Sequence, residues 1–461
     1  MQFEEDDSSL WAENRALRQR VAELEKAVQQ LEAGLKAAQD LIQELAGQKE
    51  GPPSWVKPNK PKKKPEEKKS RWKRAVEQNG ARRREEPTRV VEHKLERCSD
   101  CGYGLHWPTE LYRRQVVDMP PPPLVEVTDH VVIKQWCPHC EGWKAPKLDL
   151  RDEVLGQGRI GVRLTSLIVY LREALRVPVR KIQAYLAHQH GFRVSIGEVV
   201  GLLHRVAEQG ERAVEALKAE MRASDVVHMD ETGWREGGQN GYVWAMSVPG
   251  ERGVQIYQRH QSRGSKVVRG LLGGEFRGVL CSDFLGSYNI YRGPHQRCWV
   301  HLLRDLHKLR EEQEEQAEVV LWASEVRGLY DEAQGFVRAT SPPGEGVRWK
   351  QYETLVAKVD ELGLRYAQAK KHPCQALAKR LLRHRDELFQ FVLHERVTAD
   401  NNLAERGLRP LVVVRKISGG TRSARGTATR MVLASLFATW SVRGQNPLEE
   451  CLTLLQQTSL A

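Results

Sequence analysis

Three short stretches of this chain carry carboxylates in settings where they could do chemistry. The stretches are VVHMDETGW at 226–234, GVLCSDFLGSYN at 278–289 and ADNNLAERGLRP at 399–410. Asp230 and Asp283 each follow an apolar run that is typical of a buried strand, and Glu405 lies on an amphipathic helical pattern. Carboxylates that converge from such elements can hold two divalent cations, Mg²⁺ or Mn²⁺, which position a phosphodiester for in-line attack. The sequence therefore predicts a phosphoryl-transfer site.

Two of these acids have competing neighbours. Glu231 follows Asp230, and because successive side chains of a strand point to opposite faces, only one of them can face a shared site. In the third stretch, Asp400 and Glu405 are alternative candidates for the acid that reaches the site. A single buried carboxylate is also commonly a helix cap or an ion-pair partner. The catalytic interpretation is favoured by the joint occurrence of all three acids with the basic stretch RPLVVVRKISGGTRSARG after Glu405.

The surrounding sequence predicts the elements that would position the acids. Between 224 and 300, apolar strands alternate with glycine-rich turns, and one amphipathic helix, KVVRGLLGG, precedes the Asp283 strand. The predicted strands are VVHMD, GYVWAMSV, GVQIYQRH, GVLCSD and QRCWVH. Residues 303–397 change to long charged helical stretches, which predict an all-helical insertion. An α/β core would then consist of 223–302 and 398–461, with the second part carrying Glu405 on its first helix.

Four cysteines predict a structural metal site in residues 91–150. Cys98 and Cys101 form one Cys-x-x-Cys pair, and Cys137 and Cys140 form another. Each pair can bind one side of a tetrahedral Zn²⁺, and four thiolates leave no open position for catalysis. The strand-like LVEVTDHVVIKQW between the pairs favours a zinc ribbon. The alternatives are four unrelated buried cysteines, or substitution of a ligand by His106 or His139.

Residues 1–47 show a heptad pattern that predicts a coiled coil. Its apolar and semi-apolar positions alternate in steps of four and three, with valine at a positions, mostly leucine at d positions and one asparagine at an a position. They are Leu10, Asn14, Leu17, Val21, Leu24, Val28, Leu31, Leu35, Ala38, Ile42 and Leu45. This pattern favours a parallel two-stranded coil and therefore a homodimer or higher oligomer. The alternative is a helix that packs on the body of its own chain.

Most of the net charge lies in one arm, within residues 48–90. The segment 57–84 holds 13 lysines and arginines against three glutamates, and so carries +10 of the chain's +12. Repeated proline and few apolar residues predict disorder. Interleaved tryptophans favour contact with nucleic acid over a merely solvated linker. The candidate DNA-binding residues of this arm are Lys62, Lys63, Lys64, Arg82, Arg83 and Arg84.

Residues 151–222 have helical patterns throughout. VRKIQAYLAHQHG and FRVSIGEVVGLLHRVAEQ predict two helices joined by a short turn, and Ser195 with Glu198 fits a capping box at the second. Either a helix-turn-helix DNA reader or ordinary helical packing would give this pattern. No secretion signal and no apolar run of the roughly 20 residues needed to span a bilayer occurs, which predicts a cytoplasmic protein without membrane partners.

Four blocks of the sequence occur in the order found in one known family. They are the N-terminal coil, the double Cys-x-x-Cys ribbon, HMDET with CSDFLGSYN, and DNNLAERGLRP followed by RK; CWVHLLRD at 298–305 also matches. On these blocks the chain resembles a DDE transposase of the insertion-sequence sixty-six family over nearly its whole length. It departs from the family at Glu231, where a second Asp is frequent, and in KISGGTRSARG, which lacks a bulkier aromatic residue.

The resemblance implies a ribonuclease-H-like α/β catalytic core, interrupted before its last acidic helix. Carried over by position, Asp230 and Asp283 become the first two ligands of a catalytic Mg²⁺ or Mn²⁺ pair, and Glu405 the third. His301 and Arg304 would lie near the site. Residues that would position double-stranded DNA are Arg406, Arg409, Arg415 and Lys416.

The implied function is that of a transposase that binds the ends of a mobile element, cuts DNA with a metal-activated water and joins a 3′-hydroxyl to the target. Its implied partners are element ends, target DNA and a second copy of the chain; small accessory proteins encoded by the same element are a further class that the resemblance allows. It also implies a bacterial, nucleoid-associated protein. Two alternatives remain: a non-catalytic DNA-binding regulator derived from a transposase, and a nuclease without strand transfer.

Overall fold

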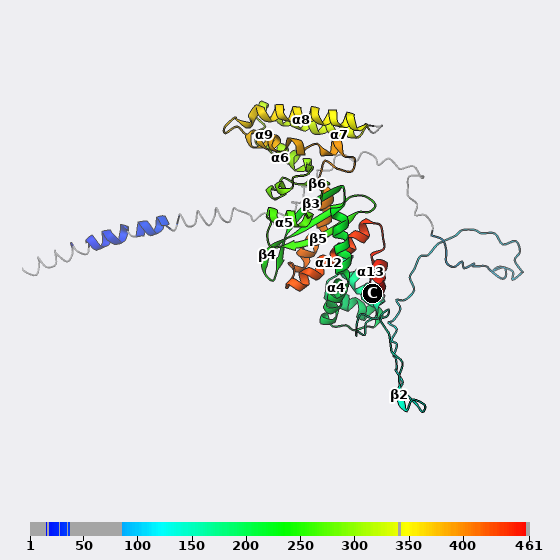
Figure 1. Ribbon diagram of the computed structural model, residues 1–461. Helices are drawn as coiled ribbons and strands as arrows, with labels where there is room; N and C mark the ends of the chain where they lie inside the picture. The colour runs from blue at the N-terminus through cyan, green and yellow to red at the C-terminus, as the bar shows by residue number, and fades with distance from the viewer. Residues whose placement is uncertain are drawn as a thin grey trace, which may run out of the picture. The chain divides into compact units, whose positions relative to one another are not determined.

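A five-stranded mixed sheet forms the centre of the larger of the two units into which the computed structural model divides, residues 119–461 (Figure 1). The structure describes residues 85–339 and 343–457, together with residues 15, 18–26, 28–34 and 36. The strands are β3 (Val226–Glu236), β4 (Gln239–Val248), β5 (Val254–His260), β6 (Val279–Ser282) and β7 (His295–Arg297). Their order is β5-β4-β3-β6-β7, with the first three antiparallel and β6 and β7 parallel to β3. This mixed α/β arrangement is compatible with a ribonuclease-H-like core.

The antiparallel half of the sheet is a meander with tight turns. Only Gly237 and Gly238 separate β3 from β4, and both have positive φ, 57° and 85°. Two left-handed residues in a row match the right-handed twist of the flanking strands, which is why glycine stands at both positions. This turn lets β3 run well beyond the part that pairs with β6. Asp230 therefore lies within a strand and not at its end, in contrast to the strand-end position predicted from the sequence.

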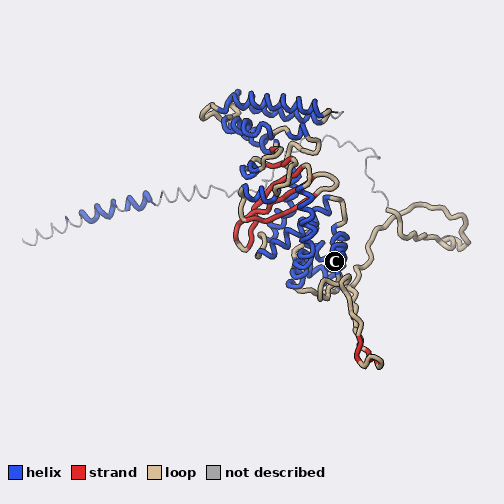
Figure 2. Tube along the Cα trace, in the orientation of Figure 1, coloured by secondary structure: helices blue, strands red, loops and turns tan. Residues whose placement is uncertain are grey.

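Helices cover both faces of the sheet (Figure 2). On one face, strand residues such as Val227, Met229 and Trp244 pack in one core with the helices α2 (Val162–Glu173), α3 (Val179–His190), α4 (Ile196–Arg222), α5 (Ser265–Leu272), α12 (Ala424–Val442) and α13 (Pro447–Gln457). On the other face, Trp234 packs against Leu408 and Leu411 of α11 (Asn402–Ser418).

The helices α2 to α4 share this core with the sheet, because α4 packs its buried face on α12. The predicted cap of α4 is present: the Glu198 backbone N–H donates to Ser195 Oγ at 3.0 Å. The turn between α3 and α4 ends α3 at Gly191 with φ of 64°. Packing of α4 against α12 and the core of the sheet accounts for its apolar pattern, and a helix-turn-helix reader remains a prediction.

In the described residues between β7 and α11 there are five α-helices and one short 3-10 helix, Arg385–Glu387. The α-helices are α6 (Trp299–Glu312), α7 (Ala317–Val337), α8 (Glu345–Ala367), α9 (Gln375–His384) and the short α10 (Gln390–Leu393). Their apolar cluster includes the buried Trp299, Trp322 and Phe389 and reaches the sheet at Val226, Val279 and Cys281. The predicted strand QRCWVH is wrong in its second half, since α6 begins at Trp299 and carries His301. The strand β7 ends at Arg297, and Cys298, in an extended conformation, is the residue that precedes the helix.

The strand-like segment 124–136 of the predicted ribbon is mostly irregular. Only a small hairpin of β1 (Gln135–Cys137) and β2 (Gly142–Lys144) forms in this region. Apolar residues such as Leu124, Val127 and Ile133 are exposed there, so they lack the burial that would sustain a longer strand. The N-terminal residues 18–26 and 28–34 are helical and expose Val21, Leu24, Val28 and Leu31. The remainder of the predicted coil lies outside the described residues.

Candidate active site

The register of two parallel strands brings Asp230 and Asp283 together. His228 of β3 is paired with Cys281 of β6, and the same register continued by two residues puts Asp283 level with Asp230. Residues in register on neighbouring strands share a face of the sheet, so both carboxylates start from the same side. Asp283 stands immediately after β6, and its Oδ1 accepts a hydrogen bond of 2.8 Å from the Leu285 backbone N–H.

The face of β3 that bears Asp230 changes from apolar to polar and back. Val226 belongs to the cluster of the helical insertion, and Trp234 belongs to the cluster under α11. His228, Asp230 and Thr232 stand between them on the same face. The site therefore occupies the seam between two apolar clusters, where burial is substantial and no hydrophobic side chain fills the strand face.

Glu405 reaches this seam from the first turn of α11, and Asn401 fixes where that helix starts. The Asn401 side chain is almost fully buried; its Nδ2 donates to the Met229 carbonyl oxygen at 2.7 Å, and its Oδ1 lies 3.3 Å from His228 Nδ1. The Asn401 backbone N–H also donates to Cys298 Sγ at 3.3 Å. Three contacts thus tie the residue before α11 to the two strand residues just before Asp230 and to the start of α6.

The other two carboxylates both act on the charge of Asp230. Burial, followed by the charge of Glu231 and those of Asp283 and Glu405, raises the pKa of Asp230 from its usual 3.8 to about 7. Glu405 Oε1 is buried and makes no hydrogen bond to any described residue. An unbonded buried carboxylate oxygen beside two further acids is costly unless a cation balances it. Oxygen-only ligands of this kind suit Mg²⁺ or Mn²⁺, so the residues present fit such an ion.

Glu231 points to the opposite face of the sheet from Asp230. Its carboxylate is almost completely buried, forms a salt bridge with Arg263 at 2.5 Å and accepts a hydrogen bond of 2.7 Å from the Tyr288 hydroxyl. Both oxygens are therefore already satisfied by protein groups. Of the two neighbouring acids, Asp230 is the one directed to the seam.

Asp400 has a local role at the start of α11. Its Oδ1 accepts a hydrogen bond of 3.0 Å from the Asn402 backbone N–H. This bond satisfies one of the N–H groups that the first turn of a helix leaves without a partner. Between the two candidates of this segment, Glu405 is the acid that interacts with Asp230.

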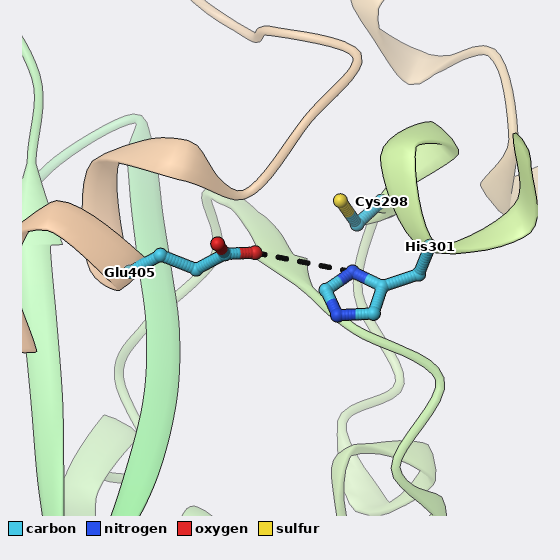
Figure 3. Close-up of side chains that lie close together, drawn as sticks. All are labelled: Cys298, His301 and Glu405. Carbon is cyan, nitrogen blue, oxygen red and sulfur yellow. Dashed lines mark ion pairs between the residues drawn. The ribbon is translucent and has the colours of Figure 1, made fainter. Parts of the chain in front are cut away.

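The start of α6 places Cys298 and His301 beside Glu405 (Figure 3). His301 Nδ1 lies 4.0 Å from Glu405 Oε1, and one atom from each of Cys298, His301 and Glu405 fall within 4.8 Å of one another. A sulfur, nitrogen and oxygen set of this size could hold a transition metal. Burial, however, raises the pKa of the Cys298 thiol, which also accepts the Asn401 N–H bond. Cys298 is therefore better explained as a neutral anchor for the loop before α11.

The insertion is linked to the Asp283 loop through Arg297. Arg297, at the end of β7, is fully buried; it donates to the Asp283 carbonyl oxygen at 2.8 Å and to Asn289 Oδ1 at 2.6 Å. Its guanidinium is paired with Glu387 of the insertion at 2.6 Å. Burial opposes ionisation of Glu387, but hydrogen bonds and charges from His384, His295 and Arg297 lower its pKa to about 2.

The predicted DNA-binding cations differ in how far their side chains are exposed. Arg304 on α6 and Arg406, Arg409 and Lys416 on α11 are exposed. Arg415 is half-buried, and its guanidinium donates to Thr232 Oγ1 at 3.0 Å and to the Gly233 carbonyl oxygen. Arg415 therefore fastens α11 to β3. The candidates of the basic arm, Lys62, Lys63, Lys64, Arg82, Arg83 and Arg84, lie outside the described residues.

Each Cys-x-x-Cys pair lies in a tight turn. The Gly102 backbone N–H donates to the Cys98 carbonyl oxygen at 2.9 Å, and the Cys140 backbone N–H donates to Cys137 Sγ at 3.4 Å. Hydrogen bonds from nearby backbone N–H groups lower the pKa of both Cys98 and Cys137. Such turns favour thiolates and are typical of zinc knuckles. Because the two pairs belong to separate units, the four-cysteine site remains a prediction.

Sequence reasoning missed Asn401, Arg263 and Tyr288. Asn401 was visible only as part of the DNN motif, and its buried bonds to β3 depend on a partner about 170 residues away. Nothing in the local pattern around Arg263 or Tyr288 indicates that they satisfy Glu231.

None of the described helices has sufficient length and hydrophobicity for a membrane-spanning segment.

A mixed sheet with acids on its central and neighbouring strands, and a third acid on a later helix, is compatible with a ribonuclease-H-like core. A family model described as Transposase IS66 family matches residues 157–429, more than half of the chain. The chain therefore belongs to the IS66 family of transposases. The matched range contains Asp230, Asp283 and Glu405.

Two relatives from Sinorhizobium fredii (strain NBRC 101917 / NGR234) are similar over part of the chain. The uncharacterized protein y4jO is 30% identical over 196 residues, which cover 41% of this chain and 57% of that protein. The uncharacterized protein y4qI is 28% identical over 209 residues, which cover 42% of this chain and 38% of that protein. The chain thus matches little more than half of the first relative's length and less than half of the second's.

Proposed function

We propose that this protein binds the ends of a mobile element and catalyses metal-dependent DNA strand cleavage and strand transfer. The proposal is supported by the register that puts Asp283 level with Asp230, and by the burial and the charges of Glu231, Asp283 and Glu405 that raise the pKa of Asp230 to about 7. Family membership supports a role in transposition.

In this proposal, Asp230, Asp283 and Glu405 hold Mg²⁺ or Mn²⁺. When bound, such ions activate the attacking oxygen and stabilise the leaving oxygen of the phosphodiester. The chain's own contribution is placement: the Arg297 bond to the Asp283 carbonyl fixes one ligand, and Asn401 fixes the helix that carries another. Burial of the seam lowers the local dielectric, which strengthens every interaction with the reacting phosphate.

DNA would be positioned by exposed cations on either side of the acids. Arg304 on α6 and Arg406 and Arg409 on α11 are exposed and can contact backbone phosphates without reading sequence. The basic arm would add sequence-independent affinity for element ends and target DNA. The exposed apolar stripe of Val21, Leu24, Val28 and Leu31 supports pairing with the N-terminal helix of a second copy, which would bring two ends together.

The test is to change Asp230, Asp283 and Glu405 singly to Ala and measure cleavage and joining of DNA carrying the element's ends. Each variant should lose activity by at least about a hundredfold while binding DNA, because a lost ligand removes stabilisation of transition-state charge. Asp400→Asn is the matched control, since it keeps the oxygen that accepts the Asn402 N–H, and it should stay active.

The outcomes separate the competing functions. Metal-dependent cleavage by the wild type without joining supports a nuclease, and DNA binding with neither reaction supports a non-catalytic regulator. Robust cleavage by Glu405→Ala would overturn the assignment of the third ligand.

A further inference from the structure

The helical insertion presents a basic concavity next to the Asp283 loop. The hollow has a volume of about 290 Å³ and is lined by Phe284, Ala376, Lys379, Arg380, Arg383 and His384. All but Phe284 belong to α9, where spacings of three, four and seven residues put them on one side of the helix. Phe284 comes from the core and directly follows Asp283, so the concavity is formed by both parts of the molecule.

One of its cations is held in place by two contacts. Arg380 forms a salt bridge with Asp305 of α6 at 2.5 Å, and its guanidinium stands 5.2 Å from the centre of the Phe284 ring. A guanidinium held over an aromatic ring keeps its remaining N–H groups directed outward. Such a group can donate to a phosphate at little cost in side-chain entropy.

The other two cations have no acidic partner. Lys379 and Arg383 are exposed, and neither makes an ion pair within the part of the chain that the structure describes. Some other cations of the insertion are neutralised, as in the pairs of Lys358 with Glu332 and Arg365 with Glu325. With Asp305 offsetting Arg380, the concavity keeps an excess of two positive charges. A solvated helix face could carry unpaired cations anywhere, but these two open into a hollow that contains the residue after Asp283.

Phe284 connects the concavity to the candidate site, because it directly follows Asp283 in the chain. Adjacent Cα atoms are about 3.8 Å apart, so Phe284 lies one residue step from the acid that faces the seam. A DNA strand whose reactive phosphate lay at Asp230 and Asp283, and which continued past Phe284, would bring a neighbouring phosphate toward the α9 residues that line the concavity. The cations of α11 belong to another element at the seam, so the α9 cations add a separate contact to the same strand.

We propose that α9 of the insertion binds the DNA backbone beside the reactive phosphate, through Lys379 and Arg383 together with the Arg380 held by Asp305 and Phe284. This inference rests on the proposed function, because it assigns part of the DNA to that same site. The insertion then acts as the wall of the active-site groove that holds the substrate strand.

The test compares the double variant Lys379→Ala with Arg383→Ala against the wild type. The matched control is Lys350→Ala with Lys370→Ala, which removes the same charge from exposed positions of the insertion outside the concavity. Binding to a random-sequence duplex is measured over a range of salt concentrations. Each phosphate contact contributes about 0.9 to the slope of log affinity against log salt, so the slope should fall by roughly 1.8 in the double variant.

Cleavage supplies a second measurement. Under saturating Mn²⁺, the double variant should show a raised KM for DNA with a smaller change in kcat, whereas the control pair should match the wild type in both. Exchange of the two cations, Lys379→Arg with Arg383→Lys, should restore the salt slope because charge is kept. Thermal unfolding of every variant at the wild-type midpoint confirms that the fold is intact.

The outcomes distinguish this inference from the proposed function. If the wild type binds DNA but never cleaves it, the proposed function fails, and the salt slopes still decide whether α9 contacts phosphate. If the wild type cleaves and the double variant keeps both its salt slope and its KM, the α9 contact is wrong. Equal losses in the test pair and the control pair would also overturn it, since the effect would then be one of net charge.

Discussion

Asn401 is the residue whose loss should separate the position of the third acid from its chemistry. Asn401→Ala removes the donor to the Met229 carbonyl oxygen, at 2.7 Å, and the oxygen that lies 3.3 Å from His228 Nδ1. Both groups are buried, and leaving a buried polar group without a partner costs about 1–3 kcal/mol. Because the loop can relax in part, we expect a loss of roughly 2–4 kcal/mol in the free energy of unfolding.

The same substitution should reduce catalysis beyond its effect on stability. Without the tie to β3, the first turn of α11 is free to shift relative to Asp230, and a misplacement of about 1 Å at a catalytic group can cost about a hundredfold in rate. Urea denaturation gives the loss of stability, and DNA cleavage at low temperature, where the variant is folded, gives the loss of rate. Glu405 itself is unchanged, so metal-dependent activity should fall and not vanish.

Two further variants decide whether the reasoning is right. Asn402→Ala is the control, because its backbone N–H donates to Asp400, alanine keeps that group, and the Asn402 side chain makes no hydrogen bond to a described residue. It should change stability by less than about 0.5 kcal/mol. Asn401→Asp keeps the size of the side chain but faces the Met229 carbonyl with an acceptor, and should destabilise at least as much as alanine. A wild-type urea midpoint and cleavage rate for Asn401→Ala would refute the role assigned to this residue.

Two other predictions concern metals. The pKa of Asp230 is raised to about 7, so below that pH a proton competes with the cation, and apparent Mg²⁺ affinity should be about tenfold weaker at pH 6 than at pH 8, as measured by calorimetry; pH-independent affinity would contradict this. The two Cys-x-x-Cys pairs predict about one Zn²⁺ per chain, lost in the Cys98→Ser, Cys137→Ser double variant; elemental analysis of protein purified without chelators checks this, and absence of zinc from the wild type would exclude the site.

The sequence was informative wherever a pattern reflects local burial. The apolar runs VVHMD and GYVWAMSV, and the helical period of KVVRGLLGG, correspond to β3, β4 and α5. The pattern failed at QRCWVH, because apolar residues that enter a helix from a short strand look the same as a longer strand. It failed also at LVEVTDHVVIKQW, where strand propensity is present but no partner buries the segment.

Of the candidate site, the sequence could predict the acidic residues but not the contacts that orient them. Alternation on a strand required that Asp230 and Glu231 diverge, but it could not say which of them would face the seam. That choice depends on Arg263 and Tyr288, which come from later segments and satisfy Glu231 on the opposite face. Register between β3 and β6 is likewise a property of two separated strands, so the level placement of Asp283 with Asp230 needed the fold.

The helical insertion is tied to the candidate site through its polar contacts with β7 and the Asp283 loop. Its half-buried Glu387 forms an ion pair with the fully buried Arg297, and Arg297 in turn donates to the carbonyl oxygen of Asp283. Loss of one partner of such an ion pair strongly destabilises the fold, because the charge of the other partner then stays buried without compensation. The insertion and the Asp283 loop must therefore fold against each other, which fixes α9 beside Phe284. A surface that is rigidly fixed one residue from a candidate metal ligand is suited to hold a substrate strand, since it needs no reordering when DNA arrives.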